Sequence, residues 1–245
     1  MAGAVNKPKN GNAMSNTSSS NKNGTTSTSS ADVVDKKRET HHVFKVRYYN
    51  DTIRTTVTHT ESVVDQWIED VYNDYADKLD NGNLVVGLDI EWARHNKVDV
   101  LQLCFAHRCL IYQFFDNEVP ESLITFLNDD GIIFVRAGID EAAHKLLVDY
   151  GLNVARTQDL GRLADCKLGT QGLYQLDLNS LVNIVLGQHL HLQPKFRRIS
   201  FSRWDRDTLK NEQVEYACLD AYASFKLGLY LFQKNKEFQE VSSRN

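Results

Sequence analysis

The chain has 245 residues, of which 42% are hydrophobic and 24% charged, and its formal net charge is −4. These values are typical of an ordinary globular protein with one or two domains. They exclude a strongly basic chain, so any contact with nucleic acid must come from a local patch. No run approaches the roughly 18 apolar residues of a membrane span, so no membrane partner is expected.

The four cysteines form no CxxC pair, which argues against a zinc site or a disulfide framework. Most of them sit in apolar surroundings, as in LQLCF, RCLIY and YACLD. Buried free thiols suit a reducing compartment, so we expect the protein in the nucleus and/or the cytoplasm.

Residues 1–41 are rich in serine, asparagine and threonine and poor in apolar side chains. Such a segment cannot bury enough apolar surface to offset the entropy that it loses on ordering. We therefore expect a disordered tail over residues 1–41, one domain over residues 42–235 and a short C-terminal tail over residues 236–245.

The domain is expected to begin with a β-hairpin. VFKVRYY and TIRTTVT are rich in β-forming residues and are joined by Asn50-Asp51, a dipeptide that favours turns. Apolar residues then recur at helical spacing within ESVVDQWIEDVYNDYADKL, and Asn81-Gly82-Asn83 ends that helix.

Three consecutive strands are expected next, in LVVGLDI, DVLQLCF and CLIYQFF, followed by a short helix around Leu123–Leu127 and a strand at IIFV. The remainder is mainly helical, with a long last helix from about Asp207 to Lys234. Gly151, Gly169 and Gly187 stand where helix C-caps belong. This order predicts an α/β domain with a mixed sheet and helices on its faces.

VVGLDIEW, residues 85–92, carries Asp89 and Glu91 into an apolar run that has the pattern of a buried strand. Side chains two residues apart on a strand point to the same face, so the two carboxylates would stand side by side. Burying ionised carboxylates costs several kcal/mol each unless a partner compensates them. The alternative is a strand end whose acids reach solvent or cap a neighbouring helix.

Two further segments place acids close to the expected core. In EYACLDAYASFKLGLY, Tyr216 and Asp220 are four residues apart and share one face of a largely buried helix. In GIDEAAHKLLVDYGL, Asp140 has the position of an N-cap, and we expect His144 to be exposed or hydrogen-bonded rather than a ligand.

Carboxylates gathered from separate elements suit Mg²⁺ or Mn²⁺, which prefer oxygen ligands. Two such ions about 4 Å apart can activate water and stabilise the leaving oxygen of a phosphodiester. The pattern of acids is therefore compatible with a metal-dependent phosphoryl-transfer site.

The motifs resemble those of the DEDD (DnaQ-like) 3′–5′ exonucleases over roughly residues 43–235. GLDIEW matches the first family motif, and YACLDAYASFKL matches the third, Tyr-x-x-x-Asp, which marks the tyrosine branch. Within that branch the chain is similar to the Werner-type exonuclease domain and its small plant relatives. The order and spacing of the motifs together carry the resemblance.

The resemblance implies an RNase H-like fold, with a mixed five-stranded sheet flanked by helices. It also implies two-metal hydrolysis of nucleotides from a 3′ end, with Asp89, Glu91 and Asp220 holding one Mg²⁺ or Mn²⁺ and Asp89 shared with the second. Tyr216 would orient the attacking water or help to deprotonate it. An ordinary tyrosine pKa near 10 favours positioning over full base catalysis.

The second motif departs from the family pattern Gly-Ile-x-x-Asp-x-x-Lys-Leu. Gly138-Ile139 and Lys145-Leu146 match on both sides, but Ala142 stands where the acid is expected. Asp140 and Glu141 are not ready substitutes, because one helical step turns a side chain by about 100°. Three of the four expected acids remain, so we expect a strongly reduced activity.

QPKFRRISFSRWDR, residues 193–206, is the most basic stretch of the chain. Arg197, Arg198 and Arg203 are the candidate phosphate contacts, and Phe196, Phe201 or Trp204 could lie near bases. The alternative is a solvated loop with Trp204 packed in the core, which is the placement that we expect for this tryptophan.

The sequence thus predicts a metal-dependent 3′–5′ exonuclease of reduced activity that acts on the 3′ ends of DNA or RNA. The main alternative is a catalytically inactive nucleic-acid-binding or scaffold protein that retains the fold, and a small-nucleotide phosphohydrolase is a further one. The expected partner is nucleic acid, and the sequence leaves a homo-oligomer open.

Overall fold

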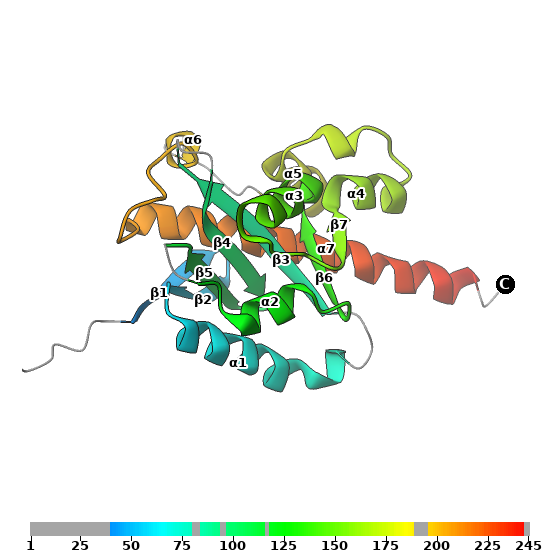
Figure 1. The fold of residues 1–245 in the computed structure, drawn as a ribbon. Coiled ribbons are helices and arrows are strands. Elements are labelled where there is room, and N and C mark those ends of the chain that lie inside the picture. Colours follow the sequence, from blue (N-terminus) through cyan, green and yellow to red (C-terminus); the bar gives the residue numbers. More distant parts are fainter. Residues whose placement is uncertain (1–39, 80–83, 94–96, 116–117, 189–195, 243–245) are drawn as a thin grey trace, which may run out of the picture. The chain divides into compact units, whose positions relative to one another are not determined.

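A seven-stranded mixed sheet forms the centre of the part of the chain that the computed structural model describes, residues 40–79, 84–93, 97–115, 118–188 and 196–242 (Figure 1). Residues 1–39 of the predicted N-terminal tail lie outside these ranges, whereas His41, which was expected in the tail, already begins the first strand. All of them belong to one unit of the chain, Arg38–Asn245.

The sheet combines a hairpin, a meander and two parallel strands, in the order β1-β2-β5-β4-β3-β6-β7. β1 and β2 form an antiparallel hairpin, and β3, β4 and β5 form an antiparallel meander, as expected. β2 is parallel to β5, β6 is parallel to β3, and β7 is parallel to β6. The strands are β1 (His41–Tyr48), β2 (Asp51–Thr58), β3 (Leu84–Trp92), β4 (Val98–Phe105), β5 (Arg108–Gln113), β6 (Ile132–Arg136) and β7 (Thr157–Asp159).

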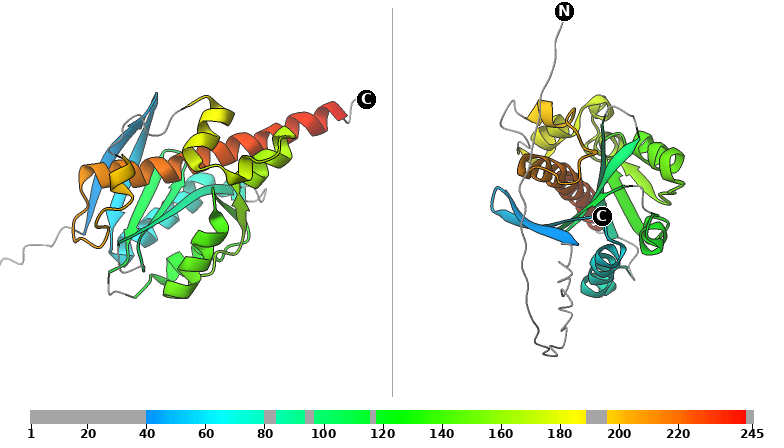
Figure 2. Two further views of the ribbon diagram at one scale, coloured as in Figure 1. Left: turned by 90° about the horizontal axis from the view of Figure 1, so that it is seen from above. Right: turned by 60° about the vertical axis from the view of Figure 1, so that its left-hand side comes forward.

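The helices cover both faces of this sheet. α7 crosses one face and packs against six strands, β1 to β6, while α1, α2 and α3 lie on the opposite side (Figure 2). The helices are α1 (Glu61–Leu79), α2 (Glu121–Leu127), α3 (Ile139–Tyr150), α4 (Leu160–Leu168), α5 (Leu178–Leu186), α6 (Phe196–Ile199) and α7 (Asn211–Ser242), with a 3₁₀ turn η1 at Leu173–Gln175. None of the described helices is both long and apolar enough to cross a membrane.

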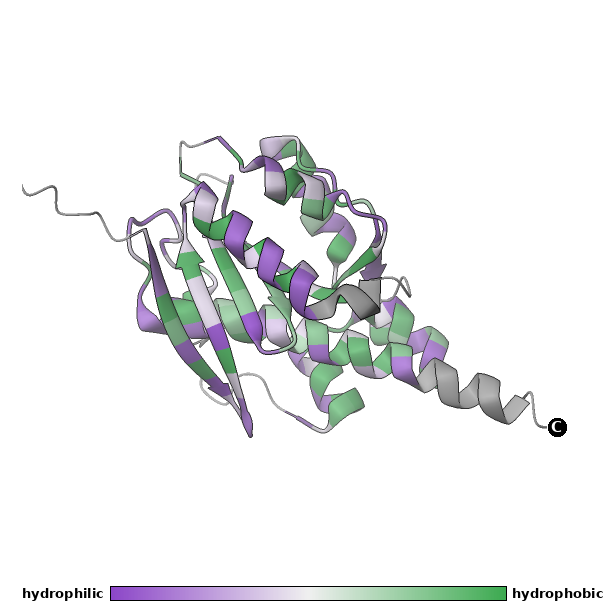
Figure 3. Ribbon diagram, turned by 90° about the horizontal axis from the view of Figure 1, so that it is seen from below, coloured by the Kyte–Doolittle hydropathy of each residue, from purple (hydrophilic) through white to green (hydrophobic). Residues whose placement is uncertain are grey.

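Aromatic side chains join the layers on each face. On one side, Phe126 of α2 lies edge-on to Trp67 of α1 and to Phe134 of β6, with ring centroids 6.0 and 5.8 Å apart. On the other side, Phe105 of β4 meets Phe225 of α7 at 5.7 Å. The outward side of α1 is hydrophilic (Figure 3), as expected for a helix with one apolar stripe.

The prediction of an α/β fold with a mixed sheet flanked by helices is confirmed, but the described sheet has seven strands rather than five. The short strand β7, Thr157–Asp159, was not predicted because three partly polar residues carry no periodic signal. The long helix begins at Asn211 rather than near Asp207, and it continues past residue 235 to Ser242.

Two local predictions were wrong and one was confirmed. The hairpin turn is Tyr49-Asn50, because Asp51 already pairs with Tyr48 as the first residue of β2. The N-cap of α3 is Gly138, with a left-handed φ of 73°, and Asp140 is instead the second helical residue. The expected glycine C-caps are present, each with φ between 62° and 69°, at Gly151, Gly169 and Gly187.

Candidate active site

Asp89 and Glu91 point from β3 toward α7. Gly87 faces α7, because a Cβ built on it would lie 1.9 Å from the carbonyl oxygen of Ala221. Alternation along the strand puts Asp89 and Glu91 on that same face. Both are buried, with 6% and 8% of their surface exposed. The strand pattern therefore does place two carboxyl groups side by side beneath a helix.

α7 supplies the other two side chains of the acidic site. Asp220 directly precedes Ala221, the residue whose carbonyl oxygen lies over Gly87. Asp220 is buried, with 7% of its surface exposed. Tyr216 lies one turn earlier and is hydrogen-bonded to Asp220. The small residues Gly87 and Ala221 allow the close approach of strand and helix that brings these carboxyl groups together.

Arg136, the last residue of β6, also belongs to the site, and the sequence analysis missed it. Its Nε donates to Asp89 Oδ1 at 2.7 Å. The backbone N–H of Ile90 donates to the same oxygen, also at 2.7 Å. Arg136 Nη1 donates to the carbonyl oxygens of Ala137 and Gly138, each at 3.0 Å. The guanidinium is thus held between the acidic site and the turn that leads into α3.

The pKa directions show that these groups form one electrostatic cluster. Burial and the neighbouring Asp89 and Asp220 raise the pKa of Glu91 well above its ordinary value. Burial also raises the pKa of Asp89, although the Arg136 guanidinium opposes this rise and Asp220 adds to it. Burial alone would lower the pKa of Arg136, but the charges of Asp89, Glu91 and Asp220 raise it. The pKa of Tyr216 rises through burial and then through the three acids.

The second-motif position on α3 offers no carboxylate to this cluster. Ala142 is 1% exposed and belongs to the hydrophobic core. Asp140 is 67% exposed along its side chain and lies 3.5 Å from Arg162 of α4. Glu141 is exposed. The expectation that neither neighbour substitutes for the missing acid agrees with this arrangement. His144 is exposed, as expected.

A cleft of about 550 Å³ opens onto the acidic site. Glu91, Arg136 and Tyr216 line its inner part, and Phe201 and Trp92 line its sides. Phe201 is 89% exposed, which is unusual for a large apolar side chain and leaves its ring open to a flat ligand. The carboxylate cluster is therefore buried but reachable from solvent.

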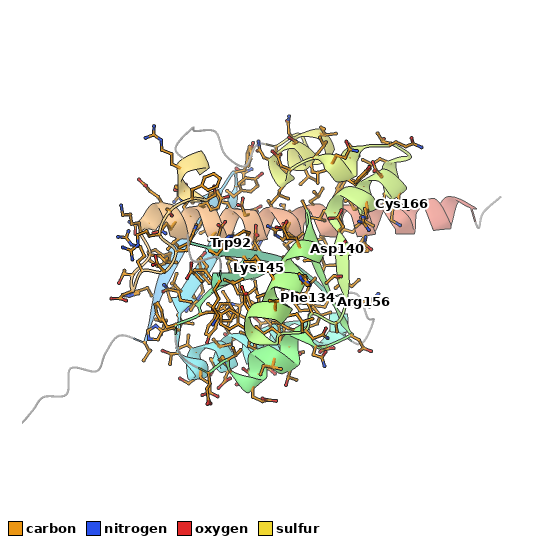
Figure 4. All side chains as sticks on the ribbon, turned by 45° about the horizontal axis from the view of Figure 1, so that its top comes forward. Trp92, Phe134, Asp140, Lys145, Arg156 and Cys166 are labelled. Atoms are coloured by element: carbon orange, nitrogen blue, oxygen red, sulfur yellow. The ribbon has the colours of Figure 1, made fainter. Side chains whose placement is uncertain are left out.

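The wall of the cleft beside Trp92 is held by α3. Lys145 lies over the Trp92 ring at 5.1 Å from its centroid (Figure 4). Lys145 also donates to Asp149 at 3.1 Å, and Asp149 accepts from the backbone N–H of Val98 at 2.9 Å. Trp92 is partly buried and packs against the core.

The basic stretch lies beside the cleft, and two of its predicted substrate residues are described. Arg198 is exposed, while the side chain of Arg197 is outside the described part. Arg203 is 77% exposed and pairs with Asp205 through two bonds of 3.1 Å. None of the described arginines of this stretch lines the cleft itself. Their role as phosphate contacts stays a prediction.

The loop that carries Phe201 is fixed from below. Trp204 is fully buried, as expected, and its ring N–H donates to the carbonyl oxygen of Ser200 at 3.2 Å. The Gln213 side chain donates to Ser202 Oγ at 3.1 Å and to the carbonyl oxygen of Arg203 at 3.0 Å. These bonds hold the loop over α7 while Phe201 stays exposed.

The donor chemistry of the acidic site suits a hard divalent cation, but its arrangement does not fit one as it stands. Carboxylate oxygens are the ligands that Mg²⁺ and Mn²⁺ prefer. Within the described ranges, however, no three acidic, histidine or cysteine side chains are grouped so that they could hold an ion. Arg136 instead donates to Asp89. Asp89 is therefore already engaged by a positively charged side chain in the described part of the chain.

A family model described as "3'-5' exonuclease" matches residues 60–235. A "3'-5' exonuclease" of Arabidopsis thaliana is 34% identical over 156 residues, which cover 60% of this chain and 52% of the relative. The "Bifunctional 3'-5' exonuclease/ATP-dependent helicase WRN" of Mus musculus is 32% identical over 169 residues, covering 66% of this chain and 11% of the relative. The chain thus spans about half, or much less, of the length of these curated relatives.

A solved structure of Escherichia coli RNase D, an exoribonuclease involved in structured RNA processing, has the same fold, with a TM-score of 0.59. It is 18% identical, and the match covers 74% of this chain and 45% of that chain. The likeness supports the RNase H-like architecture. Since the family model matches well over half of the chain and its motifs meet in one buried acidic cluster, the chain belongs to the 3′–5′ exonuclease family.

Proposed function

We propose that the chain is a 3′–5′ exonuclease-type nuclease that hydrolyses phosphodiester bonds of DNA or RNA from the 3′ end, with an activity strongly reduced by the loss of an acid at Ala142. The observation that carries this proposal is the meeting of Asp89, Glu91, Asp220 and Tyr216 in one cluster, of which Glu91 and Tyr216 line a cleft that reaches solvent. Four side chains from two distant motifs have no structural need to converge there, because buried carboxylates destabilise a fold.

Tyr216 has the role of a positioning residue in this proposal. Burial and the three carboxyl groups hold its proton in place, because its pKa is raised above the ordinary value. A phenol that keeps its proton can donate to an attacking water or to a phosphate oxygen, but it cannot take a proton from water. Tyr216 is therefore not the group that accepts a proton released in the reaction.

Mg²⁺ or Mn²⁺ belongs to the proposal as the cofactor, with Asp89, Glu91 and Asp220 as the candidate ligands. The family resemblance implies two bound ions, with Asp89 as a ligand of both. Position 142 offers no carboxylate that could help to hold a second ion, and Asp89, which would hold the first, is paired with Arg136. Both features favour a weak activity over a full one.

A second candidate function is that of a nucleic-acid-binding protein that uses the exonuclease fold without cutting. The ion pair between Arg136 and Asp89 favours it, because it engages one of the proposed ligands. The exposed ring of Phe201 favours it too, because single-stranded bases stack on such rings.

The test is digestion of 5′-labelled and 3′-labelled oligonucleotides of DNA and of RNA, with Mg²⁺ or Mn²⁺. The unaltered protein is compared with Asp89→Ala as the blank and with Ala142→Asp and Ala142→Asn as a charged and an uncharged variant. We expect slow 3′-end shortening above the blank and an increase of about 100-fold in Ala142→Asp alone, since one charged group of an active site contributes several kcal/mol.

Two outcomes decide between the candidates. Shortening by the unaltered protein above the Asp89→Ala blank supports a working exonuclease. A protein that binds oligonucleotides but never cuts, even as Ala142→Asp, supports the binding protein. Because Ala142 is buried, the melting temperature of both variants is measured beside their activity.

A further inference from the structure

Arg136 is not a surface side chain that happens to lie near an acid. Only 20% of its side chain is exposed. Three hydrogen bonds fix it, one to Asp89 Oδ1 at 2.7 Å and two to the carbonyl oxygens of Ala137 and Gly138 at 3.0 Å. The two carbonyl oxygens belong to the turn before α3, so the position of the guanidinium is set by the backbone as well as by the acid.

The acidic site needs a positive charge whether or not it binds metal. Asp89, Glu91 and Asp220 are each less than 10% exposed and lie close enough to disfavour one another's charge. Buried carboxylates are stable only if a cation or donors compensate them. A guanidinium keeps its charge at every pH that proteins experience, so it is a permanent counter-charge.

We propose that Arg136 is a built-in counter-cation of the acidic site. Its guanidinium occupies the place on Asp89 that a divalent ion would take, so Asp89 stays paired without metal and the site binds Mn²⁺ only when Arg136 is displaced. This inference rests on the proposed function in one respect, since it takes the three carboxyl groups as the reaction centre. It adds a residue that controls access of the ion, which the family motifs do not contain.

The test measures metal binding and not nuclease activity. The full chain is first stripped of metal with a chelator. Mn²⁺ binding is then followed by calorimetric titration and by the shift of the melting temperature in MnCl₂. The variants are Arg136→Gln, which removes the charge, and Arg136→Lys, which keeps the charge but lacks the fork that reaches both Asp89 and the carbonyl oxygens.

Arg162→Gln is the matched control. It also removes an arginine from an ion pair with an aspartate, but Arg162 is 69% exposed and pairs with Asp140, outside the acidic site. It should bind Mn²⁺ as the unaltered protein does and keep the same melting temperature.

We expect Mn²⁺ to leave the melting temperature of the unaltered protein almost unchanged. The melting temperature of metal-free Arg136→Gln should be several degrees below that of the unaltered protein. Mn²⁺ at about 100 times its dissociation constant should raise the melting temperature of this variant by several degrees. Its dissociation constant for Mn²⁺ should be at least about tenfold lower than that of the unaltered protein, with Arg136→Lys between the two.

The proposal is overturned if the unaltered protein binds Mn²⁺ as tightly as Arg136→Gln, or if neither Arg136 variant binds it. Should Arg136→Gln not fold, Arg136→Lys and the unaltered protein decide the matter by the same comparison. Digestion assays on the same samples keep the two proposals apart. If the unaltered protein binds Mn²⁺ as tightly as the Arg136 variants and cuts from the 3′ end, only the counter-cation proposal is rejected. If the Arg136 variants bind Mn²⁺ more tightly but no sample cuts, only the exonuclease proposal is rejected.

Discussion

Glu91 shows at the scale of one residue what the acidic site costs the fold. Its carboxyl group is 8% exposed, and its pKa is raised by burial and then by Asp89 and Asp220. Each of these effects penalises the charged form, so an ionised Glu91 opposes folding. A site kept for its chemistry is expected to be less stable than a neutral substitute of the same shape.

Replacing Glu91 by Gln should therefore stabilise the protein. The amide keeps the shape and removes the buried charge, so we expect the free energy of unfolding at neutral pH to rise by about 1 kcal/mol and the melting temperature by about 2–4 °C. Urea and thermal denaturation of metal-free protein measure both. Glu118→Gln, on an exposed residue outside the helices and strands, is the control and should change neither. A less stable Glu91→Gln would mean that the charge of Glu91 is compensated.

Phe201 carries a second prediction at this scale. Its ring is 89% exposed on the rim of the cleft, and base stacking on such a ring contributes about 1–3 kcal/mol. Phe201→Ala should weaken binding of a fluorescent single-stranded oligonucleotide about 5- to 100-fold, without a change in melting temperature. The binding is measured by anisotropy in the presence of a chelator, which prevents cutting.

The control for this prediction is Tyr174→Ala. Tyr174 is also an exposed aromatic residue, with 55% exposure, but it lies in η1 and does not line the cleft. Equal binding by the unaltered protein and Phe201→Ala would remove the ring from the binding surface.

At the scale of elements, the site depends on how closely α7 approaches β3. A Cβ on Gly87 would lie 1.9 Å from the carbonyl oxygen of Ala221 and 2.6 Å from the backbone nitrogen of Phe225. Backbone atoms of a packed helix cannot yield as a side chain can. A Cβ on Gly228 would instead meet the methyl groups of Val135 and Val85 at 2.9–3.2 Å, which can shift.

Gly87→Ala should therefore destabilise the protein far more than Gly228→Ala. Overpacking typically lowers the free energy of unfolding by about 1–3 kcal/mol. We expect the loss in Gly87→Ala to lie at or above the upper end of this range, because α7 and β3 must move apart to make room for the methyl group. In Gly228→Ala, the better helix propensity of alanine offsets part of the strain. Chemical denaturation gives both values, and an equal loss in the two variants would contradict this account of the helix–strand contact.

The elements themselves could be predicted, because periodicity and glycine caps are local signals. The meander with Asp89 and Glu91, the short helix α2 and the capped helices α3 to α5 were found in this way. The four-residue spacing of Tyr216 and Asp220 also placed them on one helix face. The contact between these two motifs, which are more than 120 residues apart in the chain, came from the family resemblance and not from periodicity.

Arg136 shows why the rest of the site could not be predicted. Val135 points toward α7, since a Cβ on Gly228 would touch it. Alternation then directs the next residue to the other face, away from Asp89. Only the end of β6 and the length of the arginine side chain let it reach the acid. A single arginine after an apolar strand has no pattern that distinguishes it from an ordinary solvated strand end.

At the scale of the whole molecule, α7, the last helix, connects the acidic site with the N-terminal hairpin. It carries Asp220 at the acidic site, and within two further turns it carries Tyr222 and Lys226, which bind Asp51 at the start of β2. The Tyr222 hydroxyl donates to Asp51 Oδ2 at 2.6 Å, and Lys226 Nζ donates to the same oxygen at 3.0 Å. The Asp51 carboxylate therefore links the hairpin of β1 and β2 to α7, the helix that carries Asp220 and Tyr216.

This carboxylate should give the protein a defined acid sensitivity. The hydrogen bond from Tyr222 lowers the pKa of Asp51, burial opposes this, and Lys226 adds to the lowering. A carboxyl group with a lowered folded pKa contributes stability that is fully present above its unfolded value of about 3.9, and this contribution is lost as the pH falls through the folded pKa. Asp51→Asn should remove about 1–2 kcal/mol at neutral pH, because hydrogen bonds to a charged partner are lost.

The measurement is the free energy of unfolding of both proteins from pH 7 down to the acid transition. The difference between them should be constant above about pH 5 and shrink below about pH 4, where the unaltered protein loses the contribution of ionised Asp51. Asp207→Asn, at an exposed loop position, should run parallel to the unaltered protein throughout. A difference that stays the same down to the acid transition would mean that the shape of Asp51, and not its charge, fastens the hairpin to α7.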